Sequence, residues 1–119
     1  LYSGAVALAA ITVQIRQNMT YPVVPADPGV TRQVLAENFD LMVIAFRFEA
    51  TAEGKLHDYT NVQSSYFDVG RFTFTLNDVT HDLGQSDSVV IQSGVCHRCP
   101  CTEAGTLITT FIPRRDNFL

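Results

Sequence analysis

Residues 71–76 read Arg-Phe-Thr-Phe-Thr-Leu and alternate between polar and apolar side chains without a fault. This period of two places Phe72, Phe74 and Leu76 on one side and the threonines on the other, as in a strand with one buried face. Residues 41–50, Leu-Met-Val-Ile-Ala-Phe-Arg-Phe-Glu-Ala, are apolar on both faces at first and alternate later, which is typical of a central strand. Both stretches favour a β-sheet protein.

Three further runs have the character of strands. Residues 9–17 alternate apolar and polar side chains, residues 88–93 are rich in β-branched residues, and residues 106–112 end at Pro113. A short helix is expected at 28–40, because Asp27-Pro28 has the order of an N-cap and first helical proline, and apolar residues follow near helical spacing. The expected fold class is mainly β, a small antiparallel β-sandwich or partly open barrel with one short helix; an α+β roll is the alternative.

Length and composition predict one domain over 1–119. It would have an extended N-terminal segment, a Pro-rich arm at 21–29 and a short C-terminal tail at 113–119. Only 17% of the residues are charged and the net charge is −4, so the basic surface of a nucleic-acid binder is missing. The uncharged stretch at 1–15 is shorter than the roughly 20 residues of a membrane-spanning helix, so no membrane span is expected.

The most unusual local feature is the run Cys96-His97-Arg98-Cys99-Pro100-Cys101, which holds all three cysteines. A Cys-x-x-Cys pair can close a small ring, so a disulfide between Cys96 and Cys99 is the favoured interpretation. Thiolates at Cys96, Cys99 and Cys101 with His97 are a less favoured zinc site, because one loop rarely reaches all four tetrahedral corners. Redox catalysis is the third alternative, and plain unpaired cysteines are the fourth.

No complete catalytic set can be assembled. His57, His81 and His97 could form a three-histidine zinc site, but scattered histidines are more often solvated polar residues. The acidic residues fall mostly at turns, and no Gly-x-Ser-x-Gly elbow or phosphate-binding glycine loop is present. We therefore predict no catalytic residue and no cofactor.

Two further features carry weaker predictions. The aromatic residues Phe46, Phe48, Phe72 and Phe74 are expected in the core, with a hydrophobic ligand cavity as the alternative. Asn18-Met19-Thr20 matches the acceptor pattern for N-glycosylation, so Asn18 is a predicted site if the chain is exported.

Low charge, apolar chain ends and extended arms favour contact over catalysis. The leading hypothesis is a structural or assembly subunit of an extracellular filament or virion-type particle, a homo-oligomer that binds copies of itself or a neighbouring subunit by strand or arm exchange. Its expected location is extracellular, at the cell surface or in a virion. The alternatives are a secreted β-sandwich binding module that recognises a protein or glycan, and a small metal- or thiol-dependent enzyme.

Overall fold

The computed structural model of the chain describes residues 13–57, 60–95 and 97–119, apart from the side chains of residues 55–57. Within this part the chain forms one antiparallel sheet and a single 3-10 turn, with no α-helix, which confirms the mainly β fold class and the partly open barrel. The elements are β1 (Val23–Pro25), β2 (Val30–Glu37), β3 (Met42–Phe48), β4 (Glu53–His57), β5 (Val62–Leu76), β6 (Val79–Gly84), β7 (Ser88–Ile91), β8 (His97–Ile112) and the 3-10 turn η1 (Asp116–Phe118).

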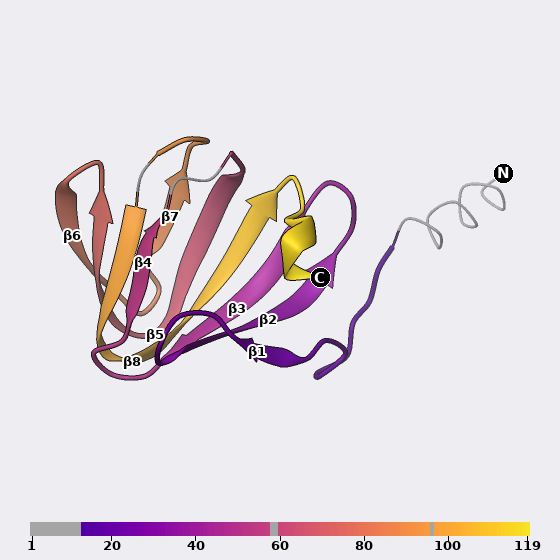
Figure 1. Ribbon diagram of the computed structural model, residues 1–119, viewed down its shortest axis with the longest axis horizontal. Helices are drawn as coiled ribbons and strands as arrows, with labels where there is room; N and C mark the ends of the chain where they lie inside the picture. The colour runs from indigo at the N-terminus through magenta and orange to yellow at the C-terminus, as the bar shows by residue number, and fades with distance from the viewer. Residues whose placement is uncertain (1–12, 58–59, 96) are drawn as a thin grey trace, which may run out of the picture.

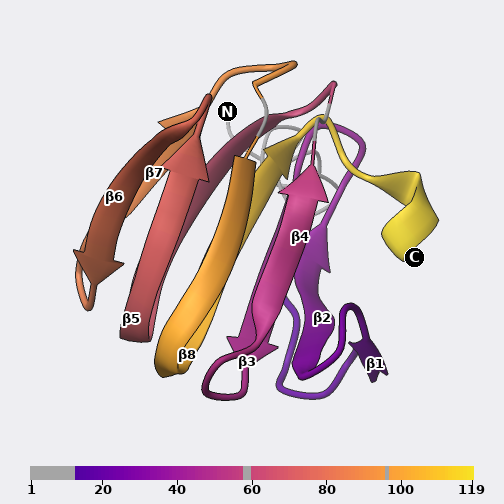
Figure 2. The same ribbon diagram turned by 60° about the vertical axis from the view of Figure 1, so that its left-hand side comes forward.

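The long strands β5 and β8 each belong to both walls of the barrel (Figures 1 and 2). The second half of β8 pairs with β3, and the first half of β5 pairs with β7, so that β1, β2, β3, β8, β5 and β7 form one wall. The first residues of β8 pair with β4 and the last residues of β5 pair with β6, which forms the opposing wall. The chain therefore closes a pocket between two walls that share their longest strands.

Two glycines allow β5 and β8 to bend where they cross between the walls. Gly70 has a φ of 90°, and a Cβ at this position would lie 2.6 Å from the carbonyl oxygen of Ala104. A Cβ at Gly105 would collide with the carbonyl oxygen of Val69. The ladder between the two strands is irregular in this region, between Phe67 and Phe72. The two backbones can approach this closely because neither residue has a side chain.

The alternation at 71–76 builds the core as expected. Phe72 and Phe74 are each 1% exposed and pack with Phe67 from the first half of β5. Phe72 also meets the ring of Phe48 edge to face, with 5.2 Å between ring centroids and an interplanar angle of 85°. This arrangement is favoured between aromatic rings. The strands expected at 41–50, 71–76, 88–93 and 106–112 correspond to β3, the end of β5, β7 and the end of β8.

The short helix expected at 28–40 is wrong, because these residues form β2. Asp27 and Pro28 start a tight turn instead: the N–H of Val30 donates to the Asp27 carbonyl at 2.8 Å, and Gly29 has a φ of 74°. Proline followed by a left-handed glycine at the two central positions suits a type II turn. A bulge between Val34 and Ala36 breaks the strand alternation and leaves apolar residues at a spacing that resembles a helix.

The strand expected at 9–17 is wrong for the residues that the structure describes. Residues 13–17 have no regular secondary structure, and Val13 and Ile15 are 59% and 76% exposed. Residues 9–12 lie outside the described residues. The Pro-rich stretch at 21–29 contains the edge strand β1, which pairs with β2. Among the described residues no helix is long and apolar enough to cross a membrane.

Candidate metal and carboxylate site

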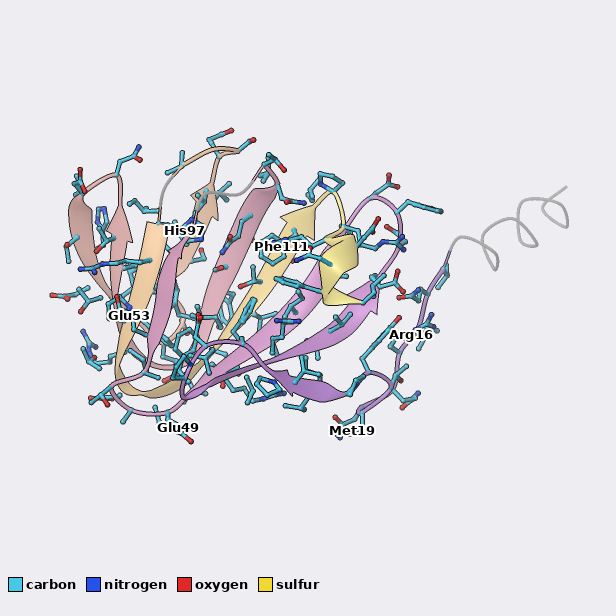
Figure 3. The ribbon with its side chains drawn as sticks, viewed as in Figure 1. Arg16, Met19, Glu49, Glu53, His97 and Phe111 are labelled. Carbon is cyan, nitrogen blue, oxygen red and sulfur yellow. The ribbon has the colours of Figure 1, made fainter. Side chains whose placement is uncertain are left out.

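A cavity of about 230 Å³ lies between the two walls of the barrel. Its wall is largely apolar, because the inward positions of the strands alternate with outward ones and carry Val30, Phe46, Phe48, Phe74, Leu107 and Phe111. The volume is below the roughly 300–1,000 Å³ of pockets for drug-sized ligands, so the cavity suits a small molecule. Figure 3 shows His97 and Phe111 toward the same end of the barrel, with Glu49 at the opposite end.

Gln63 is a buried polar residue in the cavity wall. It lies next to the first residue of β5, is 6% exposed, and donates from Nε2 to Ser65 Oγ at 3.2 Å. Ser65 Oγ also pairs with Thr109 Oγ1 at 2.8 Å. The other amide atom, Gln63 Oε1, is buried and has no hydrogen-bond partner among the described residues. An unsatisfied buried acceptor costs about 1–3 kcal/mol, so this atom is a candidate ligand contact.

His97 is the first residue of β8 and lines the same cavity. It is 5% exposed and stacks on Phe74, with 6.0 Å between ring centroids and an interplanar angle of 3°. Its Nδ1 lies 3.2 Å from the carbonyl oxygen of Val95. A carbonyl oxygen only accepts, so Nδ1 carries the proton and Nε2 carries the lone pair. This is the tautomer in which a histidine binds a metal through Nε2.

A second histidine lies close to His97 along the backbone. In the ladder between β4 and β8, His57 is the Cα partner of His97. The third histidine of the expected set, His81, lies in β6 and is exposed. The structure therefore pairs two of the three histidines in the sheet and leaves the third outside the cavity wall.

Three arginines, Arg32, Arg98 and Arg115, and the acidic residue Asp27 line the cavity. Arg98 is half exposed and forms an ion pair with Glu53 at 3.3 Å. Arg32 comes from an inward position of β2, and Arg115 comes from the C-terminal tail. Their guanidinium carbons lie 4.3 Å and 4.2 Å from the ring centroid of Phe118, and that of Arg115 lies 5.3 Å from the centroid of Phe111. Arg32 Nε is buried without a hydrogen-bond partner among the described residues. A buried guanidinium donor is stabilised by an anion, and best by a carboxylate.

The cysteine-rich run does not form the expected site. Cys99 and Cys101 are buried in β8 as free thiols, and burial raises the pKa of both, most strongly that of Cys99. The expected Cys96–Cys99 disulfide is wrong, because Cys99 is unbonded inside an extended strand, where a Cys-x-x-Cys ring would need a turn. Cys96 itself lies outside the described residues.

The expected zinc set of Cys96, His97, Cys99 and Cys101 is not assembled either. No group of three or more histidine, cysteine or acidic side chains with metal-binding geometry occurs in the part of the chain that the structure describes. The cause is the extended strand: His97 and Cys101 lie four residues apart in β8, about 13 Å, which is too far for both to bind one ion. Of the expected set, His97 and Cys99 line the cavity.

The sequence analysis did not single out Gln63, Arg32 or Arg115. A usable signal was present for Arg32, because Val30, Arg32 and Val34 share one face of β2 when the segment is treated as a strand. A charged residue on an otherwise apolar inward face indicates a binding site. Assigning the segment to a helix concealed this pattern. Asn18 is exposed in a turn, and its glycosylation stays a prediction.

No family model and no curated protein matches the sequence. Among solved structures, the chain is similar to an RmlC-like cupin from Shewanella frigidimarina, with 30% identity over 91% of this chain and 97% of that one and a TM-score of 0.84. It is also similar to KdgF from Halomonas sp., with 27% identity, 91% and 100% coverage and a TM-score of 0.84. Bacillus subtilis oxalate decarboxylase OxdC shares the fold at 17% identity, 89% and 32% coverage and a TM-score of 0.77.

These similarities correct the leading functional hypothesis. A structural or assembly subunit of a filament or virion is wrong, because the similar structures are cupins and suggest a small enzyme or a binding module. The exposed, irregular residues 13–17 explain the error, since they have the composition of a strand without pairing as one. The extracellular location was inferred together with that role; it is untested and stays a prediction.

Proposed function

The chain belongs to the cupin family, and from this premise we propose that it is a metal-dependent enzyme that acts on a small organic carboxylate bound inside its barrel. One observation carries the proposal. The same small cavity is lined by two metal-donor side chains, Gln63 and His97, and by Arg32 and Arg115, besides Asp27 and the ion-paired Arg98. Metal ligands and hydrogen-bond donors for an anion thus line one cavity. This arrangement suits a substrate that contacts both the metal and the arginines.

The donor set fits a divalent transition metal. Gln63 Oε1 lacks a partner among the described residues, and His97 Nδ1 donates to the Val95 carbonyl, so an amide oxygen and an imidazole, both common metal ligands, line the cavity. Nitrogen and oxygen donors of this kind suit zinc, manganese, iron or nickel. Such an ion, when bound, supplies Lewis-acid polarisation of a substrate oxygen.

Arg32 and Arg115 would bind and orient the substrate through its carboxylate. A guanidinium presents parallel N–H donors that match the two oxygens of a carboxylate. The Phe118 ring that both guanidiniums contact restricts where these donors lie. Because the surrounding wall is apolar and excludes water, the interaction is stronger than it would be at the surface.

The proposal is tested with succinate, malate and the neutral analogue succinamide, added to protein loaded with Zn²⁺ or Mn²⁺. Isothermal titration should detect the carboxylates and not the amide. Arg32→Met and Arg115→Met should each weaken carboxylate binding about 10- to 100-fold, since a hydrogen bond to a charged group contributes about 1.5–3 kcal/mol.

Arg47→Met is the matched control. Arg47 also lies in the sheet, but it is exposed and donates to Gln33 Oε1 at 3.0 Å. Its removal should leave carboxylate affinity unchanged. Proton NMR of the same mixtures then separates the two functional classes, because an enzyme consumes one of the carboxylates and a binding module returns all of them unaltered. Equal affinity for succinate and succinamide would contradict the proposal.

The predicted homo-oligomer has a candidate surface on the outer face of the larger wall. The central part of this face is uncharged and contains Val43, Ser64, Tyr66, Val90, Ile108, Thr110 and Ile112, which the ladders place side by side; the exposed Arg47 lies at its margin on β3. Tyr66, Val90 and Ile112 are 44%, 68% and 50% exposed. We propose that two copies pair through this face, because a surface without charge is complementary to itself under two-fold symmetry.

Sedimentation equilibrium tests the dimer. Wild-type protein should sediment at twice the mass of one chain, and Val90→Glu should sediment as a monomer. Val79→Glu is the control, since Val79 is similarly exposed, at 57%, but lies in β6 on the opposing wall. A wild-type monomer at micromolar concentration would overturn this part of the proposal.

A further inference from the structure

Both ends of the described chain attach to one carboxylate, that of Glu37. Glu37 is the last residue of β2, and its side chain is 13% exposed. It accepts hydrogen bonds from Tyr21 Oη at 2.6 Å, from Arg114 Nη1 at 2.8 Å and from Gln14 Nε2 at 3.4 Å. Its backbone N–H donates to Gln14 Oε1 at 2.6 Å. The N-terminal arm supplies Gln14 and Tyr21, and the C-terminal tail supplies Arg114.

This carboxylate is held in its charged form. Hydrogen bonds from Tyr21 and Arg114 lower the pKa of Glu37 below its ordinary value. Arg114 also binds within the tail. Its Nε donates to Oδ1 of Asp116, the first residue of η1, at 2.7 Å. The ion pair between Glu37 and Arg114 is therefore short, partly buried and continuous with the tail.

The tail, residues 113–119, depends on few contacts. None of the residues of η1 is buried. Asn61 Nδ2 donates to the Pro113 carbonyl at 2.6 Å, and Phe118 packs edge to face on Phe46 and Phe111, with centroids 6.5 Å and 6.0 Å apart. A surface segment with little buried area opens readily unless polar contacts hold it.

We propose that Glu37 is a positioning residue: through Arg114 it fixes the tail so that Arg115 and Phe118 stay in the cavity wall and the carboxylate site is complete. This inference rests on the proposed function, since Arg115 is one of the two arginines assigned to the substrate carboxylate. Glu37 does not line the cavity, so it acts on the bound carboxylate only through the tail. The N-terminal arm contributes through Tyr21, which holds Glu37 from the opposite side.

The test compares Glu37→Gln, Arg114→Gln and Arg114→Lys in the full chain. The first two variants should weaken succinate binding about tenfold, the effect of losing one coupled contact of about 1.4 kcal/mol. Zn²⁺ affinity should stay unchanged, because Gln63 and His97 are held by β5 and β8 and not by the tail. Arg114→Lys keeps the positive charge and should recover part of the lost affinity. Asp78→Asn is the control and should bind succinate as the wild type does, because Asp78 is exposed in the turn between β5 and β6 and lies outside the network of Glu37 and Arg114.

Hydrogen exchange of the backbone amides at 114–119 gives a second readout that needs no ligand. Exchange should accelerate in Glu37→Gln and stay unchanged in Asp78→Asn. Unchanged exchange and unchanged succinate affinity in Glu37→Gln would overturn the inference. If the wild type binds no succinate, the proposed function fails, and the exchange data alone decide whether Glu37 holds the tail. A simultaneous loss of Zn²⁺ affinity in Glu37→Gln would also overturn it, since that result indicates a general loss of structure.

Discussion

Replacing Gln63 by methionine should stabilise the metal-free protein while it weakens metal binding. The side chain is of similar size, so the cavity wall keeps its shape. Removing Oε1 eliminates an unsatisfied buried acceptor, which recovers about 1–3 kcal/mol, and losing the Nε2 bond to Ser65 costs about 0.5–1.5 kcal/mol. Ser65 keeps its bond to Thr109, so no new unsatisfied group appears. We expect a net gain of about 1 kcal/mol in the free energy of unfolding.

Urea unfolding of chelator-treated protein measures this change, and a gain of about 1 kcal/mol corresponds to about 3–5 °C in Tm for a chain of this size. Gln33→Met is the matched control. Gln33 is equally buried, at 3% exposed, but both of its amide atoms are used: Nε2 donates to the Tyr21 carbonyl and Oε1 accepts from Arg47. This control should lose about 1–3 kcal/mol. If Gln63→Met destabilises the metal-free protein as much as Gln33→Met does, the reasoning about Oε1 is refuted.

Three further predictions concern the thiols, the strand crossing and pH. Cys99 should resist iodoacetamide at pH 8 in the native protein and react after unfolding, because burial raises its pKa; peptide mass spectrometry measures the labelling. Gly105→Ala should lower the free energy of unfolding by about 1–3 kcal/mol in urea titrations, since the added Cβ meets the Val69 carbonyl. The pKa of Glu37 is lowered in the folded chain, so the charged carboxylate stabilises the fold at neutral pH and this stabilisation is lost on acidification. The difference in the free energy of unfolding between wild type and Glu37→Gln should therefore close below about pH 4. A difference that stays constant with pH would contradict this.

The fold class could be predicted from the sequence because strand periodicity is a local signal. The alternation at 71–76 needs only one buried face, and Phe72 and Phe74 occupy it. The predictions from strand periodicity were wrong where a strand contains a bulge or where an alternating segment does not pair. At 28–40 a bulge shifted the apolar residues of β2 toward helical spacing, and residues 9–17 were expected to be a strand although 13–17 do not pair.

Of the candidate site, only His97 was named from the sequence, because the parts of the site are far apart along the chain. Gln63, His97 and Arg115 come from the start of β5, the start of β8 and the tail, and only the bending of the two long strands brings them to one cavity. The cysteine-rich run attracted attention because its residues are adjacent in sequence. In an extended strand, residues that are adjacent in sequence point to opposite faces or lie several ångströms apart. The run therefore contributes His97 and Cys99 to the cavity without forming the expected zinc ligand set.

The central claim is that one cavity binds a metal and a carboxylate together. Isothermal titration of succinate into Zn²⁺-loaded and into chelator-treated protein tests it most directly. We predict binding of one succinate per chain to the metal-loaded protein and affinity about tenfold or more weaker without the metal, because the ion and the two arginines would hold the same molecule. Equal affinity in the two forms, or no binding in either, would contradict the account.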